Sequence, residues 1–440
     1  PAQINVPRDY WTQVIDIDLP PIVRFERQGG GKEAIDRAAK LLSEAKFPVI
    51  LSGAGVVIGD AVENCKKLAE KLDAPVCNGY QHNDSFPGSH PLAVGPLGYN
   101  GSKAGMELIS QADVVLALGT RLNPFSTLPG YGIDYWPKNA KIIQVDMNPD
   151  RIGLTKKVTV GICGDAKMVS EQILEKLTPK AGDNGREERK NLIHQTKSAW
   201  LQTLTSLDHE DDDPGTVWNK EARERDSDRM SPRQAWRAIQ AGMPEDVIIS
   251  SDIGNNCAIG NAYPTFEKPR KYLAPGLFGP CGYGFPSILG AKIGCPDTPV
   301  IGFAGDGAFG ISMNEMSSCA REEWPAITMV IFRNYQWGAE KRNSILWFDD
   351  NFVGTELDPE LSYAKVANAC GLNGVKVKTM EETTKAIRQS CEDQKKGITT
   401  FIEVILNQEL GEPFRRDAMK KPIQVAGIDK KDMKPQKGLN

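Results

Sequence analysis

Residues 299–308 read Pro-Val-Ile-Gly-Phe-Ala-Gly-Asp-Gly-Ala, and this stretch decides the fold class. Its apolar part, Pro299–Ala304, predicts a buried strand that stops directly at Gly305-Asp306-Gly307. A second apolar run, Thr328–Arg333, ends at Asn334 after an interval long enough for one helix and its loops. Two buried strands joined through a helix predict neighbouring parallel strands of an α/β sheet.

The residues that follow these two strands have the chemistry of a metal site. In a parallel sheet, Asp306 and Asn334 would lie at the carboxyl edge, where such sheets bind ligands. A carboxylate and an amide oxygen are hard donors that suit Mg²⁺, whose coordination is usually completed by phosphate groups. Gly305 and Gly307 allow backbone N–H groups to approach phosphates, and the start of the next helix favours anions. A lone Gly-Asp-Gly is common in turns, so the prediction depends on its spacing to Asn334.

The same alternation of helix and strand continues on both sides of this stretch. Between residues 30 and 180 it predicts helices at Lys32–Ala45, Ala61–Leu72 and Ala166–Leu177, and strands at Phe47–Ser52, Pro75–Asn78, Asp113–Leu118 and Lys141–Val145. Further along it predicts a helix at Pro232–Ala241, opened by Ser231 as N-cap, and strands at Asp246–Ser250, Pro299–Ala304, Thr328–Arg333 and Thr400–Ile405. The near-continuous apolar strands are typical of sheets covered on both faces. We therefore predict an α/β protein with two doubly wound parallel-sheet domains in series.

Composition suggests where these domains begin and end. We expect a central α/β domain at residues 21–185 and a second α/β domain at residues 231–412, joined by a charged linker at residues 186–230. The linker, which contains the acidic run Glu210–Asp213, is expected to be a solvated helix and loop. Residues 413–440 are basic and broken by proline, and we expect a wrapping tail. Ile4–Val6 has the character of a strand, so residues 1–20 are expected to end an upstream domain.

The central unit contains one feature that could indicate a dinucleotide site. Gly53-Ala54-Gly55 follows a strand, and Asp146 follows another. The third glycine of a dinucleotide fingerprint is missing at the required spacing. We therefore favour a structural strand-to-helix turn over a nicotinamide cofactor.

Bulk properties exclude several classes of partner. The chain has a formal net charge of -4 with 25% charged residues, which provides no basic field for nucleic acid or anionic membrane. Apolar runs such as Val114–Leu118 are far shorter than the roughly 20 residues of a membrane span. Nine cysteines occur without CxxC pairs, which indicates reduced thiols and a cytoplasmic protein.

The spacing from Gly305-Asp306-Gly307 to Asn334 resembles the thiamine diphosphate-binding signature of the acetolactate synthase and pyruvate decarboxylase superfamily. That signature usually ends in two asparagines, whereas Arg333 precedes Asn334 here. We take Asn334 as the ligand because Gly338 follows at the distance found in the family. The resemblance implies Asp306, Asn334 and the main-chain carbonyl of Gln336 as Mg²⁺ ligands. It also implies cofactor contacts from their neighbours, which are Gly305, Gly307, Ala308, Gly338 and Ala339.

Two upstream segments resemble other parts of the same cofactor site. Gly276–Gly284 resembles the glycine-rich loop that holds the aminopyrimidine ring, which implies that the carbonyl of Gly279 accepts a hydrogen bond from its amine and that Cys281 supports the bent cofactor. Cys281 could equally be an ordinary buried thiol. Gly254, Asn255 and Asn256 resemble the segment that touches the diphosphate from the other side, although they could simply cap the next helix.

A narrower resemblance, to the sulfoacetaldehyde acetyltransferase family, extends over nearly the whole chain. It rests on four blocks: Gln81–Pro87, Gly95–Tyr99, Gln336–Lys341 and Gly411–Lys421. It implies thiamine diphosphate- and Mg²⁺-dependent conversion of sulfoacetaldehyde and phosphate into acetyl phosphate and sulfite, by a homodimer or homotetramer. Ala2–Trp11 resembles the last strand of the family's pyrimidine-binding domain, which carries the activating glutamate. We therefore assign that role to no glutamate here, and expect the 440 residues alone to be inactive.

The two anionic substrates imply positive charge near the pocket. The candidates are Lys341, Arg342, Arg415 and Arg416, each of which could instead be a solvated surface residue. His82 and His90 flank a loop that the family directs towards the cofactor, with either a loop-stabilising or a substrate-contacting role. Three alternatives stay open: an acetolactate synthase-like carboligase, a cofactor-binding module without turnover, and a flavin in the central domain.

Overall fold

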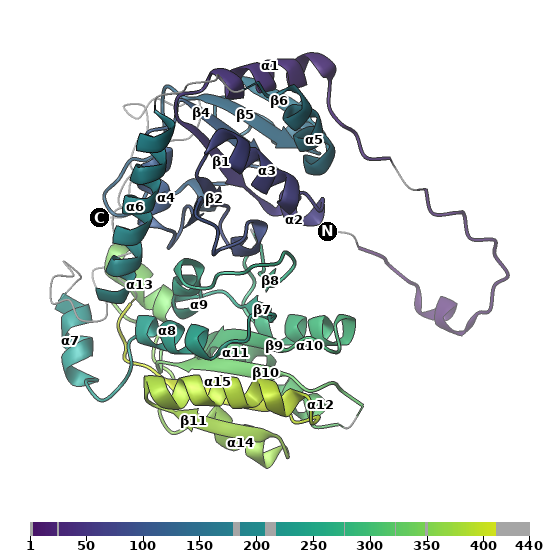
Figure 1. Cartoon of the computed structure of the whole chain (residues 1–440). Coiled ribbons are helices and arrows are strands. Elements are labelled where there is room, and N and C mark those ends of the chain that lie inside the picture. Colours follow the sequence, from purple (N-terminus) through teal and green to yellow (C-terminus); the bar gives the residue numbers. More distant parts are fainter. Residues whose placement is uncertain are drawn as a thin grey trace.

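The computed structural model describes residues 3–23, 26–178, 185–206, 217–276, 278–321, 323–347 and 351–410. It contains two sheets, each with six parallel strands. Helices lie on both faces of each sheet, and the two sheets form separate units, one above the other in Figure 1. The predicted fold class, two α/β domains in series, is therefore confirmed.

The first unit is built around strand β1. In spatial order its strands are β3 (Ala93–Pro96), β2 (Val76–Asn78), β1 (Pro48–Ser52), β4 (Val114–Leu118), β5 (Lys141–Asp146) and β6 (Val160–Cys163). Its helices are α1 (Lys32–Glu44), α2 (Ala54–Ile58), α3 (Val62–Leu72), α4 (Lys103–Ile109) and α5 (Ala166–Lys176). Helix α1 forms because Ile35, Ala38 and Leu42 recur on one face, and all three are buried in the core. Chain order reverses between β1 and β4, which opens a crevice at their carboxyl ends.

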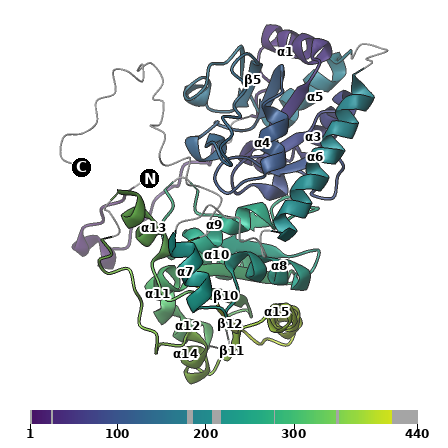
Figure 2. The same ribbon diagram turned by 90° about the vertical axis from the view of Figure 1, so that its left-hand side faces the viewer.

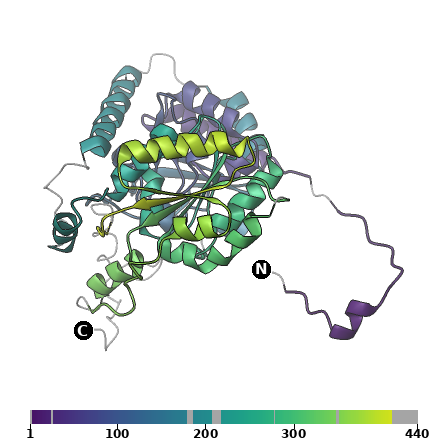
Figure 3. The same ribbon diagram turned by 90° about the horizontal axis from the view of Figure 1, so that it is seen from below.

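The second unit has the same architecture. In spatial order its strands are β11 (Asn373–Val377), β12 (Thr400–Ile405), β10 (Thr328–Arg333), β9 (Val300–Gly305), β7 (Ile248–Ser251) and β8 (Tyr272–Leu273). Its helices are α8 (Pro232–Gly242), α9 (Asn255–Ile259), α10 (Gly284–Gly294), α11 (Asp306–Ser312), α12 (Met316–Cys319), α13 (Gly338–Trp347), α14 (Tyr363–Ala369) and α15 (Met380–Gln394). Helix α15, the yellow-green helix of Figure 3, packs against α8 and β12.

Aromatic side chains cover both faces of the second sheet. On one face Trp236 of α8 lies 4.7 Å from Phe303 and 5.4 Å from Phe332, measured between ring centroids. On the other face Phe285, Phe309 and Phe401 form a second buried cluster. Ser231 is the N-cap of α8, as the sequence predicted, and it also forms a capping box with Gln234. Truncating the fully buried Trp236 should cost about 3–5 kcal/mol of stability.

The expected solvated linker is instead a packed helix. Helix α6 (Arg186–Ser206) runs beside the first unit towards the second, as Figure 2 shows. Ile193, Trp200 and Leu204 are buried, and they join the core clusters of the two units. Their spacing places them on one face of the helix, a pattern that the high charge of this segment conceals. Helix α7 (Val217–Arg225) follows, while Glu210–Asp213 lies outside the described residues.

The expected strand at Ile4–Val6 is not present. These residues are exposed, and a short 3-10 helix at Arg8–Thr12 follows them. A strand needs a neighbour that pairs its N–H and C=O groups, and among the described residues no strand runs beside this segment. The block Gly411–Lys421 and the expected tail at residues 413–440 lie outside the described residues. Within the described residues, no helix combines the length and apolarity that crossing a membrane requires.

Two of the family-specific blocks lie at the contact between the units. The side chain of Asn83 donates to the carbonyls of Asn261 (2.9 Å) and Pro264 (2.8 Å) in the second unit. Asn261 in turn accepts from the backbone N–H of Gln81 (3.0 Å) and donates to the carbonyl of Tyr99 (3.1 Å). Asn261 is fully buried and follows directly after α9, so these bonds hold α9 against the central unit.

Candidate active site

A cavity of about 250 Å³ lies at the carboxyl edge of the second sheet, where β7, β9 and β10 end. Its lining includes every cofactor candidate from the sequence: Gly254, Asn255, Asn256, Gly279, Cys281, Gly305, Asp306, Gly307, Ala308, Asn334, Gln336, Gly338 and Ala339. These residues come from four separate segments of the chain. The fold therefore brings the predicted set together, and its role in binding stays a prediction.

Asp306 is the buried carboxylate of this cavity. Its Oδ1 accepts from the N–H of Gly307 (2.9 Å), and its Oδ2 accepts from the N–H of Tyr335 (2.7 Å) and from Nη1 of Arg333 (3.0 Å). Burial raises the pKa of Asp306 to about 6, and the nearby Arg333 and these N–H donors oppose that rise. The carboxylate is thus fixed in orientation, as a metal ligand must be.

The loop that follows β10 is held in an unusual conformation. Tyr335 has a φ of 61°, in the left-handed region that non-glycine residues seldom adopt. The flanking groups pair with an antiparallel segment: Trp337 N–H donates to Thr355 O (2.8 Å), and Leu357 N–H donates to Tyr335 O (2.9 Å). In this pairing the carbonyl of Gln336 points away from the paired segment, so it is available as a ligand.

Three buried amide side chains around the cavity have an unpartnered oxygen. Oδ1 of Asn255, Oδ1 of Asn256 and Oε1 of Gln336 accept no hydrogen bond from the described residues, although all three side chains are buried. Such oxygens are costly to bury unless a cation or a donor reaches them. A Cβ added to Gly338 would lie 3.4–3.6 Å from the amide nitrogens of Asn255, Asn334 and Gln336, so this glycine keeps the space between them open.

These observations test whether Mg²⁺ and thiamine diphosphate suit the cavity. A fixed carboxylate, an amide side chain and a turned-out carbonyl are the oxygen donors that Mg²⁺ prefers. The unpartnered oxygens mark a place that is completed by a ligand, and Gly254, Gly305 and Gly338 leave room for it. The donor set fits the metal and the cofactor.

Asp252 organises the glycine-rich loop, although the sequence did not point to it. Its carboxylate accepts from the backbone N–H of Gly282 (3.1 Å), Gly284 (2.7 Å) and Ile253 (2.8 Å). A Cβ added to Gly279 would lie 3.5 Å from the Ile253 side chain. The glycine-rich loop therefore passes directly over Ile253. The sequence signal that could have identified Asp252 is its position as an acidic residue directly after a buried strand. Residue 277 of this loop lies outside the described residues.

Cys281, Trp337 and Glu340 complete the wall of the cavity. Cys281 is exposed, so it is not an ordinary buried thiol, and partial desolvation, with Asp252 and Glu340 nearby, raises the pKa of its thiol. The thiol is therefore protonated at neutral pH, which argues against a nucleophilic role. The Trp337 ring lies so close to Gly307 that a Cβ there would be 2.8 Å from it. Trp337 and Glu340 were not predicted as site residues, since neither carries a metal-ligand pattern.

The two cationic candidates within the described residues, Lys341 and Arg342, do not line the cavity. Lys341 is buried and pairs with Glu356, and Arg342 is buried and donates to the hydroxyl of Tyr99 (3.1 Å). Neither is a solvated surface residue, so that alternative was wrong. Both side chains are engaged in holding α13 in place, Arg342 against the central unit. Arg415 and Arg416 lie outside the described residues.

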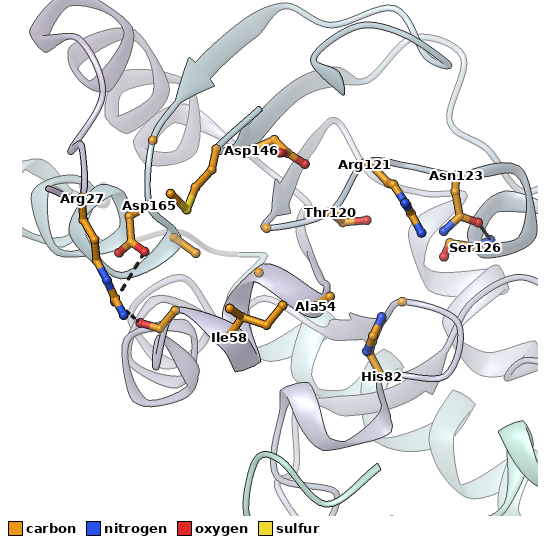
Figure 4. Close-up of a pocket in the computed structure, with 17 residues that line it drawn as sticks. Arg27, Ala54, Ile58, His82, Thr120, Arg121, Asn123, Ser126, Asp146 and Asp165 are labelled. Carbon is orange, nitrogen blue, oxygen red and sulfur yellow. Dashed lines mark hydrogen bonds and ion pairs between the residues drawn. The ribbon is translucent and has the colours of Figure 1, made fainter. Parts of the chain in front are cut away.

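The two histidines also lie away from this cavity. His90 packs edge-on against Phe86, and its ring is 3.3 Å from Glu70. His82 lines a different cavity in the central unit, shown in Figure 4. Burial, reinforced by Arg121, lowers the pKa of His82 to about 4, so the ring is neutral at physiological pH. His90 supports its loop by accepting from the N–H of Leu92 (3.2 Å), and neither histidine lines the predicted cofactor cavity.

The central cavity has a volume of about 420 Å³ and lies at the carboxyl ends of β1 and β4. The glycines after β1 are explained by close packing, because a Cβ at Gly55 would lie 2.7 Å from Cα of Gly119. At one end of the cavity Arg27 donates to the carbonyl of Gly59 (3.0 Å) and lies 3.5 Å from Asp165 (Figure 4). This geometry agrees with a structural turn at Gly53-Ala54-Gly55.

Comparison with known proteins places both units in one superfamily. Residues 35–177 match the family model for the thiamine pyrophosphate enzyme central domain, and residues 252–404 match that for the C-terminal TPP binding domain. The chain is 77% identical over 439 residues to the probable sulfoacetaldehyde acetyltransferase of Rhizobium meliloti, covering 100% of this chain and 74% of that protein. The chain belongs to the sulfoacetaldehyde acetyltransferase family.

Other relatives support the same placement. The sulfoacetaldehyde acetyltransferase of Roseovarius nubinhibens is 73% identical over 436 residues, which cover 99% of this chain and 72% of that protein. The probable acetolactate synthase large subunit of Methanococcus aeolicus is 28% identical over 402 residues, 89% of this chain and 65% of that protein. The chain thus spans about three quarters of the length of its nearer relatives. Both resemblances predicted from the sequence are confirmed.

Proposed function

We propose that the protein converts sulfoacetaldehyde and phosphate into acetyl phosphate and sulfite, with thiamine diphosphate and Mg²⁺ as cofactors. The observation that carries this proposal is the 77% identity to a probable sulfoacetaldehyde acetyltransferase along the whole chain. The cavity at the end of β9 and β10 supports it, since it combines a buried carboxylate with unpartnered amide oxygens.

We propose that Asp306, Asn334 and the main-chain carbonyl of Gln336 hold the metal ion. Asn255 and Asn256, at the start of α9, would contact the diphosphate from the opposite wall. The carbonyl of Gly279 would accept from the pyrimidine amine, with Ile253 and Cys281 beneath the bend of the cofactor. When bound, thiamine diphosphate would supply the carbanion chemistry that the aldehyde carbon requires. These residues bind and orient the cofactor, and the central unit keeps α9 in place through Asn261.

The carboxylate that activates the pyrimidine is assigned to no residue of this chain. Asp306 and Glu340 are the carboxylates among the described residues that line the cavity. Asp306 is committed to the metal in our proposal, and Glu340 is exposed on the first turn of α13. Binding of thiamine diphosphate without any turnover by the full-length protein would favour the alternative of a cofactor-binding module.

The test is the product formed by the full-length protein. Sulfite release should require sulfoacetaldehyde, thiamine diphosphate and Mg²⁺ together, and acetyl phosphate should appear only when phosphate is supplied. Acetolactate formed from pyruvate, with no activity on sulfoacetaldehyde, would overturn the proposal in favour of a carboligase. The 28% identity to an acetolactate synthase makes this the relevant comparison.

We further propose a cytoplasmic homodimer or homotetramer. All nine cysteines are free thiols, which suits a reducing compartment. Light scattering on the purified protein would measure the number of subunits.

A further inference from the structure

Arg333 stands where the superfamily signature usually has asparagine, and it is fully buried behind the proposed metal site. Its guanidinium has five N–H donors in a rigid fork. Nη1 donates to Oδ2 of Asp306 (3.0 Å), and Nη2 donates to the carbonyls of Asp358 and Leu361 (3.0 Å for Leu361). Its plane lies over the Tyr335 ring, 4.2 Å from the centroid. The side chain therefore contacts Asp306, the ligand loop and the segment paired with that loop.

The first consequence concerns the oxygens of Asp306. A carboxylate oxygen has two lone pairs. Oδ2 accepts two hydrogen bonds, from Arg333 and from the N–H of Tyr335, so both of its lone pairs are used. Oδ1 accepts one, from the N–H of Gly307, and keeps one lone pair. With Arg333 in place, Asp306 can offer a metal ion one oxygen and not two.

The second consequence concerns the loop at residues 334–337. This loop pairs with residues 355–357 through two backbone hydrogen bonds. Arg333 fixes the continuation of that segment by binding the carbonyls of Asp358 and Leu361. Because Tyr335 is in a strained left-handed conformation, the loop needs such external contacts to keep its shape.

The third consequence concerns charge. Glu403 of β12 is fully buried, and its Oε1 lies 3.9 Å from Nε of Arg333. Its Oε2 accepts from the hydroxyl of Ser362 (2.6 Å) and the N–H of Ala364 (3.1 Å). Arg333 thus stands between two buried carboxylates, and its charge offsets that of Glu403 while Asp306 faces the cavity.

We propose that Arg333 is a positioning residue that makes the metal site selective for Mg²⁺ over Ca²⁺. It saturates Oδ2 of Asp306, so that the carboxylate coordinates through Oδ1 alone, and it holds the loop that carries Asn334 and Gln336. One-oxygen coordination suits Mg²⁺, which requires near-ideal octahedral geometry, whereas Ca²⁺ accepts carboxylates through both oxygens. This inference rests on the proposed metal site.

The test compares Mg²⁺ and Ca²⁺ in supporting thiamine diphosphate binding to the full-length protein, measured by calorimetry. Arg333→Lys keeps the positive charge but loses the forked guanidinium donors. The lysine therefore cannot bind both the Asp306 carboxylate and the carbonyls of Asp358 and Leu361. We expect Mg²⁺ affinity to fall about 10–100-fold, the usual effect of changing a residue that supports a metal ligand. Ca²⁺ affinity should fall much less, because the released carboxylate can bind Ca²⁺ with both oxygens.

Two further variants make the result decisive. Arg229→Lys is the matched control, since Arg229 also lies over the Tyr335 ring (5.0 Å) but pairs with Asp226, and it should leave the Mg²⁺/Ca²⁺ ratio unchanged. If Arg333→Lys does not fold, the double variant Arg333→Gln/Glu403→Gln removes both buried charges together and should show the same loss of selectivity.

The outcomes separate this inference from the proposed function. An equal fall for both metals, or an unchanged ratio in both Arg333 variants, would mean a merely structural role and would refute the inference alone. If the unaltered protein binds thiamine diphosphate without needing a divalent metal, the metal site and the inference fail together.

Discussion

The two α/β units share one architecture but differ in what occupies the carboxyl edge of the sheet. Both have six parallel strands and a cavity at the ends of the inner strands. In the central unit the glycines of the edge are packed against other backbone, and charged groups such as Arg27 and Asp165 pair with each other. In the second unit Gly254 and Gly305 have open space where a Cβ would lie, and buried amide oxygens that line the cavity have no partner among the described residues.

The comparison shows how a site can be recognised on a shared fold. The fold provides a crevice in both units, but unpartnered buried amide oxygens line the cavity only in the second unit among the described residues, and such oxygens indicate a ligand. The predictions below change one unit at a time, so that each result either separates the two units or shows that they are coupled.

The largest effect is expected from Asp306→Ala. The variant removes the fixed carboxylate from the second cavity, so Mg²⁺-dependent affinity for thiamine diphosphate should fall more than about a thousandfold, beyond the roughly 10–100-fold of supporting residues. Calorimetric titration with the cofactor measures this. Asp146→Asn, at the rim of the central cavity, is the control and should bind the cofactor normally. Undiminished binding by Asp306→Ala would refute the metal assignment.

The next effect is a pH dependence located in the central unit. The pKa of His82 is about 4 in the folded protein against 6.5 as its ordinary value, because of burial and then Arg121. Between pH 6.5 and pH 4, His82 is protonated in the unfolded chain but neutral in the folded protein. The free energy of unfolding therefore falls as pH is lowered from 6.5 to 4, and His82 causes no further loss below pH 4. The loss should approach about 3 kcal/mol, because a tenfold change in proton affinity corresponds to about 1.36 kcal/mol. Denaturant titrations at several pH values measure it.

His82→Gln should remove most of this slope, since glutamine does not titrate in the range. His194→Gln is the matched control because His194 is exposed on α6. A slope that persists in His82→Gln would show that another group controls acid stability.

A pair of glycine substitutions should separate folding from binding. In Gly338→Ala the added Cβ meets three amide nitrogens at ordinary contact distances of 3.4–3.6 Å, so the protein should fold while cofactor affinity drops about tenfold. In Gly55→Ala the Cβ would lie 2.7 Å from Cα of Gly119, so the central unit should lose about 1–3 kcal/mol. Thermal unfolding and cofactor titration of both variants test this. If each variant changed thermal stability and cofactor affinity to the same extent, folding and cofactor binding would not be separated between the two units.

The smallest effect is expected from Cys281→Ala. The exposed thiol lines the proposed cofactor cavity, and partial desolvation raises its pKa, so we expect it to stay protonated and to take no chemical part. Turnover by the full-length protein should stay within about twofold of the unaltered protein, with a modest change in cofactor affinity from lost contact area. A loss of turnover at unchanged cofactor affinity would show that the thiol participates in the reaction.

Much of the fold followed from local pattern, and the exceptions have local causes. The ends of Thr328–Arg333 and Thr400–Ile405 agree with the structure because these strands are mainly apolar and buried along their whole length, with Arg333 and Glu403 as their buried charges. Strand β6 (Val160–Cys163) was not predicted, since it is short and interrupted by an exposed glycine. It exists because β5 offers a neighbour to pair with. Pairing of this kind is not visible in the segment itself.

The residues that could form the site were predictable from the sequence alone. Their spacing from strand ends places Asp306, Asn334 and the glycines at one edge, because parallel strands all end on the same side of a sheet. Which of the charged residues face the cavity depends on how the chain packs in three dimensions. Lys341 and Arg342 are adjacent to the predicted ligands in sequence, yet they pair with Glu356 and Tyr99. Arg333 and Asp252 have no site pattern, yet they orient the carboxylate and the glycine loop. These roles could not be predicted because the hydrogen-bond partners of buried groups come from segments far away in the sequence. Packing of the whole domain brings those segments together.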